Sequence, residues 1–269
     1  MPAVITLLCA GFPERSHRYW ERGLANLTAL PAPPTRPRYG FILVQEARVV
    51  GALLLIYAPE TLGARANVSS WYVVPEFRAY AALLVGKALR AKDVTYINIS
   101  PAPATRPILT AQGYRPYVNG LLTAFPALAR GRARVEALAP ERHGRFLPAE
   151  ELTLLQDHAR LGAIVLLAGP GEAAMQPFVF ARRRLTRLRL PGAQLIYCRD
   201  TQAFADMAGA IGRRLLREHR IYTVALDCDA PIQGLPGRFK MGNNPKYARG
   251  PNPPRQNDLA YTELAIFGD

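Results

Sequence analysis

The sequence has few cysteines, few histidines and no long apolar run, and each shortage excludes a class of protein. Its three cysteines form no C-x-x-C pair, and its four histidines lack metal-site spacing; this argues against a disulfide framework and a bound metal, and it favours a reducing compartment. No stretch reaches the roughly 20 apolar residues of a membrane span. The apolar run 3–10 is short and follows no basic segment, unlike a signal peptide. We therefore expect a soluble, cytoplasmic protein without membrane contact.

Negative charge is also scarce. The chain has 34 basic and 20 acidic residues, a net charge of +14 and a pI near 10.2. Such a balance favours anionic partners: nucleic acid, a membrane surface or phosphorylated small molecules. Only four of the basic residues are lysines, and an arginine excess in an alanine- and proline-rich chain reflects genomic base composition equally well.

Hydrophobic residues make up 49% of the 269 positions, enough for one large domain or two smaller ones. The pattern predicts strands at 3–10, 41–45, 49–56, 68–74 and 94–100, helices at 75–90 and 105–112, and two closing strands in 114–127 divided at Asn119-Gly120. After a basic stretch at 129–132 a similar order of strands and helices restarts. In a gapless alignment of the two halves, Tyr222 is aligned with Tyr96. We predict an α/β protein (a mixed α+β sheet) of two tandem lobes, 1–129 and 133–269, each a mostly antiparallel sheet flanked by helices.

Two motifs carry a family resemblance. The first is Trp71-Tyr72-Val73-Val74-Pro75-Glu76-Phe77-Arg78, which resembles a V-x-P-x-x-R strand end and loop. The second is Ile97-Asn98-Ile99-Ser100 followed by a helix that ends Gln112-Gly113-Tyr114. With the order of elements, these motifs resemble the GNAT superfamily of acyl-CoA-dependent N-acyltransferases, which implies acyl-CoA as donor. Free backbone N–H groups at a helix start suit its pyrophosphate.

The resemblance assigns cofactor contacts residue by residue. Val73 and Val74 would pair with the pantetheine arm, and Asn98 and Thr105 would contact the cofactor from the neighbouring strand and helix. The pyrophosphate would be wrapped by Arg78, Ala79, Tyr80, Ala81 and Ala82. The chain departs from the pattern at two glycine positions, filled by Ala81 and Leu83, and at the family's general-acid tyrosine, which falls on Leu109.

The second lobe looks degenerate. Gly209-Ala210-Ile211-Gly212 resembles the family's glycine-rich helix start, but no V-x-P-x-x-R precedes it, so packing glycines are the favoured interpretation. Asp227 and Asp229 flank Cys228 at a strand end, either as a base or cation site or as an ordinary turn.

The segment 237–255 is basic and rich in Gly, Asn and Pro, which predicts either an anion-binding lid that uses Lys240 and Lys246 or a solvated loop. A strand at 258–263 would place Tyr261 and Glu263 on one face. Glu263 is then the candidate base, and Tyr261 or Tyr247 the candidate acid; a packed tyrosine and a solvent-facing glutamate are equally compatible with this sequence.

These features predict an acyltransferase that moves an acyl group, by expectation acetyl, from acyl-CoA to an amine or hydroxyl of a small, acidic acceptor. The alternative is a non-catalytic acyl-CoA-binding or nucleic-acid-binding protein on the same scaffold. Nucleic acid is less favoured because Tyr247 is the only ring in 241–255, which leaves few platforms for bases.

Overall fold

The computed structural model describes residues 1–31, 33–185 and 190–268, and it divides into two compact units. Unit 1 comprises Met1–Asn98, Ala248–Pro253 and Tyr261–Phe267, whereas unit 2 is built on Ile99–Tyr247 and Pro254–Ala260. The units therefore differ from the predicted lobes. Residues 99–129 belong to unit 2, and two segments of the C-terminal region return to unit 1.

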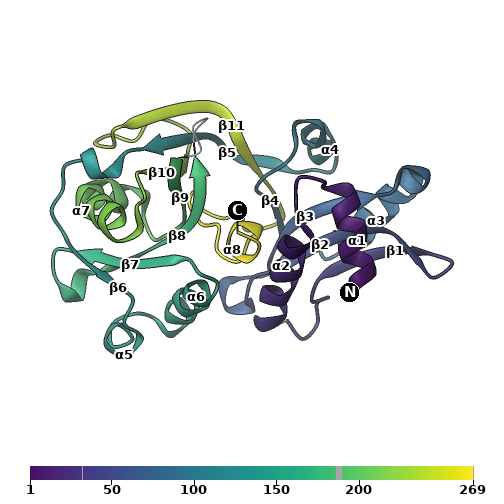
Figure 1. Cartoon of the computed structure of the whole chain (residues 1–269), viewed down its shortest axis with the longest axis horizontal. Helices are drawn as coiled ribbons and strands as arrows, with labels where there is room; N and C mark the ends of the chain where they lie inside the picture. The colour runs from purple at the N-terminus through teal and green to yellow at the C-terminus, as the bar shows by residue number, and fades with distance from the viewer. Residues whose placement is uncertain (32, 186–189, 269) are drawn as a thin grey trace. The chain divides into compact units, whose positions relative to one another are not determined.

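Unit 1 holds a four-stranded sheet in the order β1-β2-β3-β4 (Figure 1). Its elements are α1 (Pro2–Gly11), α2 (His17–Ala29), β1 (Gly40–Gln45), β2 (Arg48–Tyr57), η1 (Glu60–Leu62), β3 (Arg65–Val73), η2 (Pro75–Tyr80), α3 (Ala81–Ala88), β4 (Thr95–Asn98) and α8 (Glu263–Ile266). β1, β2 and β3 are antiparallel, and β4 is parallel to β3. A parallel neighbour needs a crossover, which α3 supplies.

The predicted first strand at 3–10 is wrong, because these residues form helix α1. Pro2 stands in the first helical turn, where a missing N–H costs nothing. The helix packs on β2 and β3, and it ends at Gly11, where a Cβ would lie 2.3 Å from the Tyr72 ring. Burial of one apolar face thus outweighs the β propensity of its Val and Ile residues.

Unit 2 has the strand order β11-β5-β10-β9-β8-β7-β6. Its elements are η3 (Pro103–Thr105), α4 (Arg106–Ala111), β5 (Arg115–Ala124), η4 (Pro126–Leu128), β6 (Arg134–Ala137), α5 (Pro140–His143), α6 (Ala149–Arg160), β7 (Ile164–Gly169), η5 (Glu172–Ala174), β8 (Gln176–Leu185), β9 (Leu190–Cys198), α7 (Thr201–His219), β10 (Thr223–Cys228) and β11 (Gly237–Arg249), which runs past Tyr247. β9 and β10 are parallel, with α7 between them in sequence.

Two local predictions for this part of the chain are wrong. Asn119-Gly120 is not a turn, because β5 continues through it beside β10, and the Asn119 N–H is bound by the Asp229 carboxylate at 2.7 Å. The segment 237–255 is not a lid, because its first thirteen residues form β11. Pairing in a sheet here overrides the turn propensity of Gly, Asn and Pro.

The two units share one arrangement. In each, an antiparallel strand carries a register shift, a helix follows, and the next strand runs parallel to the shifted one. The core of unit 2 lies under this arrangement, where Phe204 of α7 packs between Phe178 and Phe180 of β8. Among the described residues, no helix is long and apolar enough to cross a membrane.

Candidate functional site

The site in unit 1 begins at a bulge in β3. Tyr72 pairs with Ala52 of β2, but Ser69 pairs with Leu54, so β3 carries one extra residue between these pairs. Ser70 takes a left-handed φ of 52° there. A bulge re-aims side chains and interrupts the ladder, and bulges are frequent beside active sites.

The strand also loses its parallel neighbour at this point. β3 and β4 pair only from Arg65↔Thr95 to Asn67↔Ile97, so β3 continues past the paired region. Asn67 closes the end of the pairing, because its buried side chain donates to the Ile97 carbonyl at 3.3 Å and accepts the Glu263 N–H at 2.8 Å. Among the described strands, none pairs with this edge along the last part of β3.

The alternation of backbone groups along β3 decides whether Val73 or Val74 can hydrogen-bond a ligand at this edge. The Val74 N–H donates to the Val50 carbonyl of β2, and the Val74 carbonyl accepts from Phe77. Both backbone groups of Val74 are therefore hydrogen-bonded within the protein. Because successive residues of a strand face opposite sides, Val73 directs its N–H and carbonyl to the side that β4 has left.

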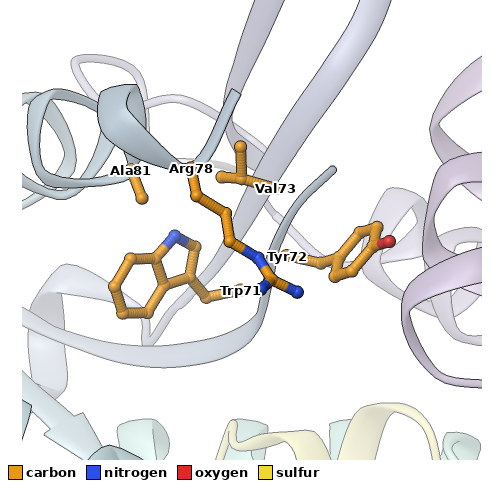
Figure 2. Close-up of a pocket in the computed structure, with 5 residues that line it drawn as sticks. All are labelled: Trp71, Tyr72, Val73, Arg78 and Ala81. Carbon is orange, nitrogen blue, oxygen red and sulfur yellow. The ribbon is translucent and has the colours of Figure 1, made fainter. Parts of the chain in front are cut away.

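A pocket of about 280 Å³ lies at this edge, lined by Trp71, Tyr72, Val73, Arg78 and Ala81. Figure 2 shows the Arg78 guanidinium reaching from η2 into the space between the Trp71 and Tyr72 side chains. Trp71 Nε1 is buried and has no hydrogen-bond partner among the described residues. A buried donor without a partner is costly, so a ligand acceptor at this nitrogen would satisfy it.

The predicted pyrophosphate loop is a 3₁₀ turn. The Ala81 N–H donates to the Arg78 carbonyl, so this group is engaged within the turn. Of the residues named for the loop, Arg78 and Ala81 line the pocket, whereas Ala79, Tyr80 and Ala82 lie in η2 and α3 outside its lining. Asn98 ends β4, and Thr105 ends η3 in unit 2. Trp71 and Tyr72 were missed, although they stand directly before Val73 in the same motif.

The strand predicted at 258–263 does not exist, so period two does not align Tyr261 with Glu263. Tyr261 has a left-handed φ of 53° and is 2% exposed. Glu263 opens helix α8, which α2 anchors through Arg22 and Asn26 bound to the carbonyls of Phe267 and Ile266. Tyr247 lies in β11 of unit 2. The amide of Glu263, held on Asn67, places this residue at the end of the β3–β4 pairing.

In unit 2 the equivalent opening is filled by the chain itself. β9 and β10 pair over Gly192–Gln194 and Thr223–Ala225, and a bulge follows in β9. The Asn257 side chain accepts the Asp227 N–H at 2.8 Å and donates to the Asp227 carbonyl at 3.0 Å. The Leu259 N–H donates to the Ile196 carbonyl at 2.7 Å. These bonds occupy the strand edges that a ligand would need.

A buried ion pair lies beside this filled opening. Lys246 Nζ donates to Asp227 Oδ1 at 2.6 Å, and both side chains are fully buried. Burial raises the pKa of Asp227 above its ordinary value, and the Lys246 ammonium opposes that rise. Lys246 therefore neutralises an internal carboxylate, which contradicts its predicted role as a surface anion ligand.

The two cysteines that end β9 and β10 are buried. Burial raises the pKa of Cys198 to about 12 and that of Cys228 to about 11. A nucleophilic cysteine needs a lowered pKa, because the thiolate is the reactive form. Within the described ranges, no group of three or more His, Cys, Asp or Glu side chains could hold a metal ion.

The fold of this chain resembles solved structures of acetyltransferases, one of them GCN5-related. A Pyrococcus horikoshii protein classed as an acetyltransferase superposes with a TM-score of 0.56 at 10% identity, over 97% of this chain and 89% of that one. The GCN5-related glucosamine N-acetyltransferase region of a fungal multi-domain GH3 β-N-acetylglucosaminidase gives a TM-score of 0.52 at 11% identity, over 91% of this chain and 36% of that one.

A GCN5-related N-acetyltransferase of Anabaena variabilis gives a TM-score of 0.47 at 14% identity, over 77% of this chain. The chain spans 61% of the length of that protein. No protein-family model and no curated protein matches the sequence. The predicted mixed α/β fold and its likeness to GNAT proteins are confirmed, at the level of fold.

Proposed function

We propose that the chain is an acyltransferase whose unit 1 takes acyl-CoA and transfers its acyl group to an amine or hydroxyl. The pocket at the β3 bulge carries the proposal, because it combines an unpaired strand edge at Val73, an unpartnered donor on Trp71 and the Arg78 cation. These groups fit the amide-bearing arm and the phosphates of CoA. The activity of GNAT-fold proteins in general supports the assignment.

In this reaction the protein would orient the substrates, stabilise charge and remove a proton. The Val73 backbone would align the pantetheine arm, and Arg78 would bind a phosphate oxygen, so that the thioester is held in one orientation. Backbone and indole N–H groups would stabilise negative charge on the thioester oxygen as the acceptor attacks. The C–S bond then breaks as the new C–N or C–O bond is kept, and CoA leaves as its thiolate, which takes a proton from solvent. We propose Glu263 as the group that takes the acceptor's proton, since its amide is fixed at the end of the β3–β4 pairing.

The repeated arrangement supports a tandem duplication in which unit 2 has lost ligand binding. Asn67 and Gln194 stand at equivalent places, each a buried carboxamide at the last parallel pair before the strands separate. In unit 2 the residues around Asn257 fill the opening that a donor would enter. Strand β5 of the first predicted lobe belongs to unit 2, and the segments 248–253 and 261–267 of the second predicted lobe belong to unit 1.

Turnover distinguishes this function from a non-catalytic acyl-CoA-binding protein. The purified chain would be incubated with acetyl-CoA and pools of amines and alcohols, and free thiol would be followed. Acceptor-dependent thiol release above the rate of spontaneous hydrolysis supports the enzyme. Tight CoA binding without release in any pool supports the alternative.

Ala81→Asp is expected to weaken acetyl-CoA binding at least about 30-fold, because the carboxylate would stand in the pocket beside the phosphates. Isothermal titration calorimetry would measure the loss. Ala3→Asp, on the exposed first turn of α1, is the matched control and should bind as the parent does. Equal affinities for all three chains would contradict the assignment.

Acetyl-CoA is expected to bind with a stoichiometry of one per chain. Unit 1 has an unpaired strand edge, whereas the edges in unit 2 are occupied by Asn257 and Leu259. The same calorimetric titration gives the number directly. Two equivalents per chain would show that 254–260 leaves the unit 2 opening.

A further inference from the structure

A basic surface forms where helix α7 meets the segment that joins β5 to β6. The two run in close contact because Gly209 and Gly212 have no side chains, and the Gly209 N–H donates to the Arg130 carbonyl at 3.3 Å. Arg213 of the helix (α7 in Figure 1) donates to the carbonyl of Gly131, which lies between Arg130 and Arg132, and Arg217 follows Arg213 one helical turn later. Arg182 of β8 reaches the end of the same helix, where it donates to the His219 carbonyl. We call these five residues the arginine face; all five are exposed.

The charges of the arginine face are not neutralised within the protein. Arg213 donates to the Gly131 carbonyl at 3.2 Å, and Arg217 donates to the Arg213 carbonyl at 3.3 Å. In the part of the chain that the structure describes, no member of the face forms an ion pair with a carboxylate. A guanidinium bound to a carbonyl keeps its full charge, so these five cations can bind an anion; Asp206 and Glu218 are the exposed acidic residues of the same helix.

His219 lies in the last turn of α7, where its side chain contacts Arg182. Burial lowers its pKa below the ordinary value, and the neighbouring Arg182 charge lowers it further. Unit 2 as a whole has 22 basic and 13 acidic residues, a net charge of +9. Three separate segments of unit 2 contribute exposed arginines that lie in α7 or contact it.

We propose that the arginine face binds the phosphodiester backbone of a nucleic acid. Several fixed guanidinium groups along one helix match a regular series of phosphates, which arginine binds in bidentate fashion. Tyr222, 46% exposed and two residues after Arg220, supplies a ring on which a base can stack. This site is distinct from the pocket of unit 1 and does not depend on the acyltransferase proposal.

The exposed positions of α7 argue against a membrane as the occupant. They carry Gln202, Asp206, Arg213, Arg217 and Glu218, so the helix presents no apolar stripe to insert into a bilayer. Leu128 is exposed beside the face, but a single leucine buries too little area to hold a protein on lipid.

The test uses the full chain and three charge-matched double variants. Fluorescence anisotropy would follow a labelled single-stranded RNA and a labelled duplex DNA at several salt concentrations. Arg213→Gln with Arg217→Gln, and Arg130→Gln with Arg132→Gln, each remove two cations from the face. Arg18→Gln with Arg48→Gln removes two exposed cations from unit 1. Thermal melting would establish that each variant is folded.

We expect each face variant to bind at least about 10-fold more weakly and to flatten the slope of log affinity against log salt by about 1.4 to 1.8 for its two lost contacts. The unit 1 variant should bind nearly as the parent does. Equal losses in all three variants would reduce the effect to net charge and overturn the proposal. A failure of both the RNA and the DNA to bind would also overturn it. So would binding of the parent chain to phosphatidylserine vesicles, tested alongside, without binding to either nucleic acid.

Discussion

Lys246→Met is expected to lower the free energy of unfolding by roughly 3–5 kcal/mol, because it leaves the Asp227 carboxylate buried without its counter-charge. Both side chains are fully buried, so water cannot take the place of the ammonium. Asp227 Oδ2 already has no hydrogen-bond partner among the described residues. Urea denaturation followed by circular dichroism would measure the loss.

The loss should grow with pH. Burial already raises the pKa of Asp227, and without the ammonium that opposes this rise the folded-state pKa moves higher still. A group whose folded pKa exceeds its unfolded pKa stabilises the fold fully below the unfolded pKa and loses that contribution as pH rises through the folded pKa. The variant should therefore lose about 1.4 kcal/mol per pH unit above pH ~4, until the folded-state pKa is reached.

Two control variants separate the ion pair from simple truncation. Lys240→Met, on an exposed position of the same strand, should change stability by less than about 0.5 kcal/mol. Lys246→Met combined with Asp227→Leu should recover most of the loss, since an apolar pair needs no counter-charge. A loss that is independent of pH, or that persists undiminished in the double variant, would contradict this account.

The strand end and turn that line the unit 1 pocket could be predicted because their signal is local. The motif from Trp71 to Arg78 becomes the end of β3 and η2, and Val73, Arg78 and Ala81 line the pocket. The hairpin expected at 41–56 forms as β1 and β2. The alternation of a strand and a proline near a helix start are patterns of a few neighbouring residues. They can therefore be recognised in the sequence alone.

What the sequence could not reveal depends on contacts between distant residues. The run 3–10 is apolar throughout, and such a run suits a buried strand as well as a helix, so only packing on β2 and β3 decides. Lys246 gives no local sign that Asp227, nineteen positions away, will bury it. The return of Tyr261–Phe267 to unit 1 depends on contacts between distant residues, among them the packing of Phe267 on Tyr19 and Trp20.

The glycines of α7 show both what the sequence indicates and what only the structure decides. Gly209 and Gly212 resembled a cofactor loop as well as a packing contact, and spacing alone could not separate the two. In the structure, a Cβ on Gly209 would lie 2.4 Å from the Ala129 carbonyl oxygen, and a Cβ on Gly212 would lie 2.3 Å from the Ala127 nitrogen. Both neighbours are backbone atoms, which cannot turn aside as a side chain can. The glycines therefore permit the close contact between α7 and the segment after β5.

Replacing both glycines with alanine is accordingly expected to lower the free energy of unfolding by roughly 3–5 kcal/mol, because each added methyl forces backbone apart in a packed region. Gly86→Ala in α3 is the matched control: nothing lies within 4 Å of its added Cβ, so the helix should gain about 0.5–1 kcal/mol from the lost backbone freedom of glycine. Thermal and urea denaturation would measure both. If the α7 variant kept its stability and instead lost acetyl-CoA binding, the glycines would serve the cofactor, and the donor site would have to move to unit 2.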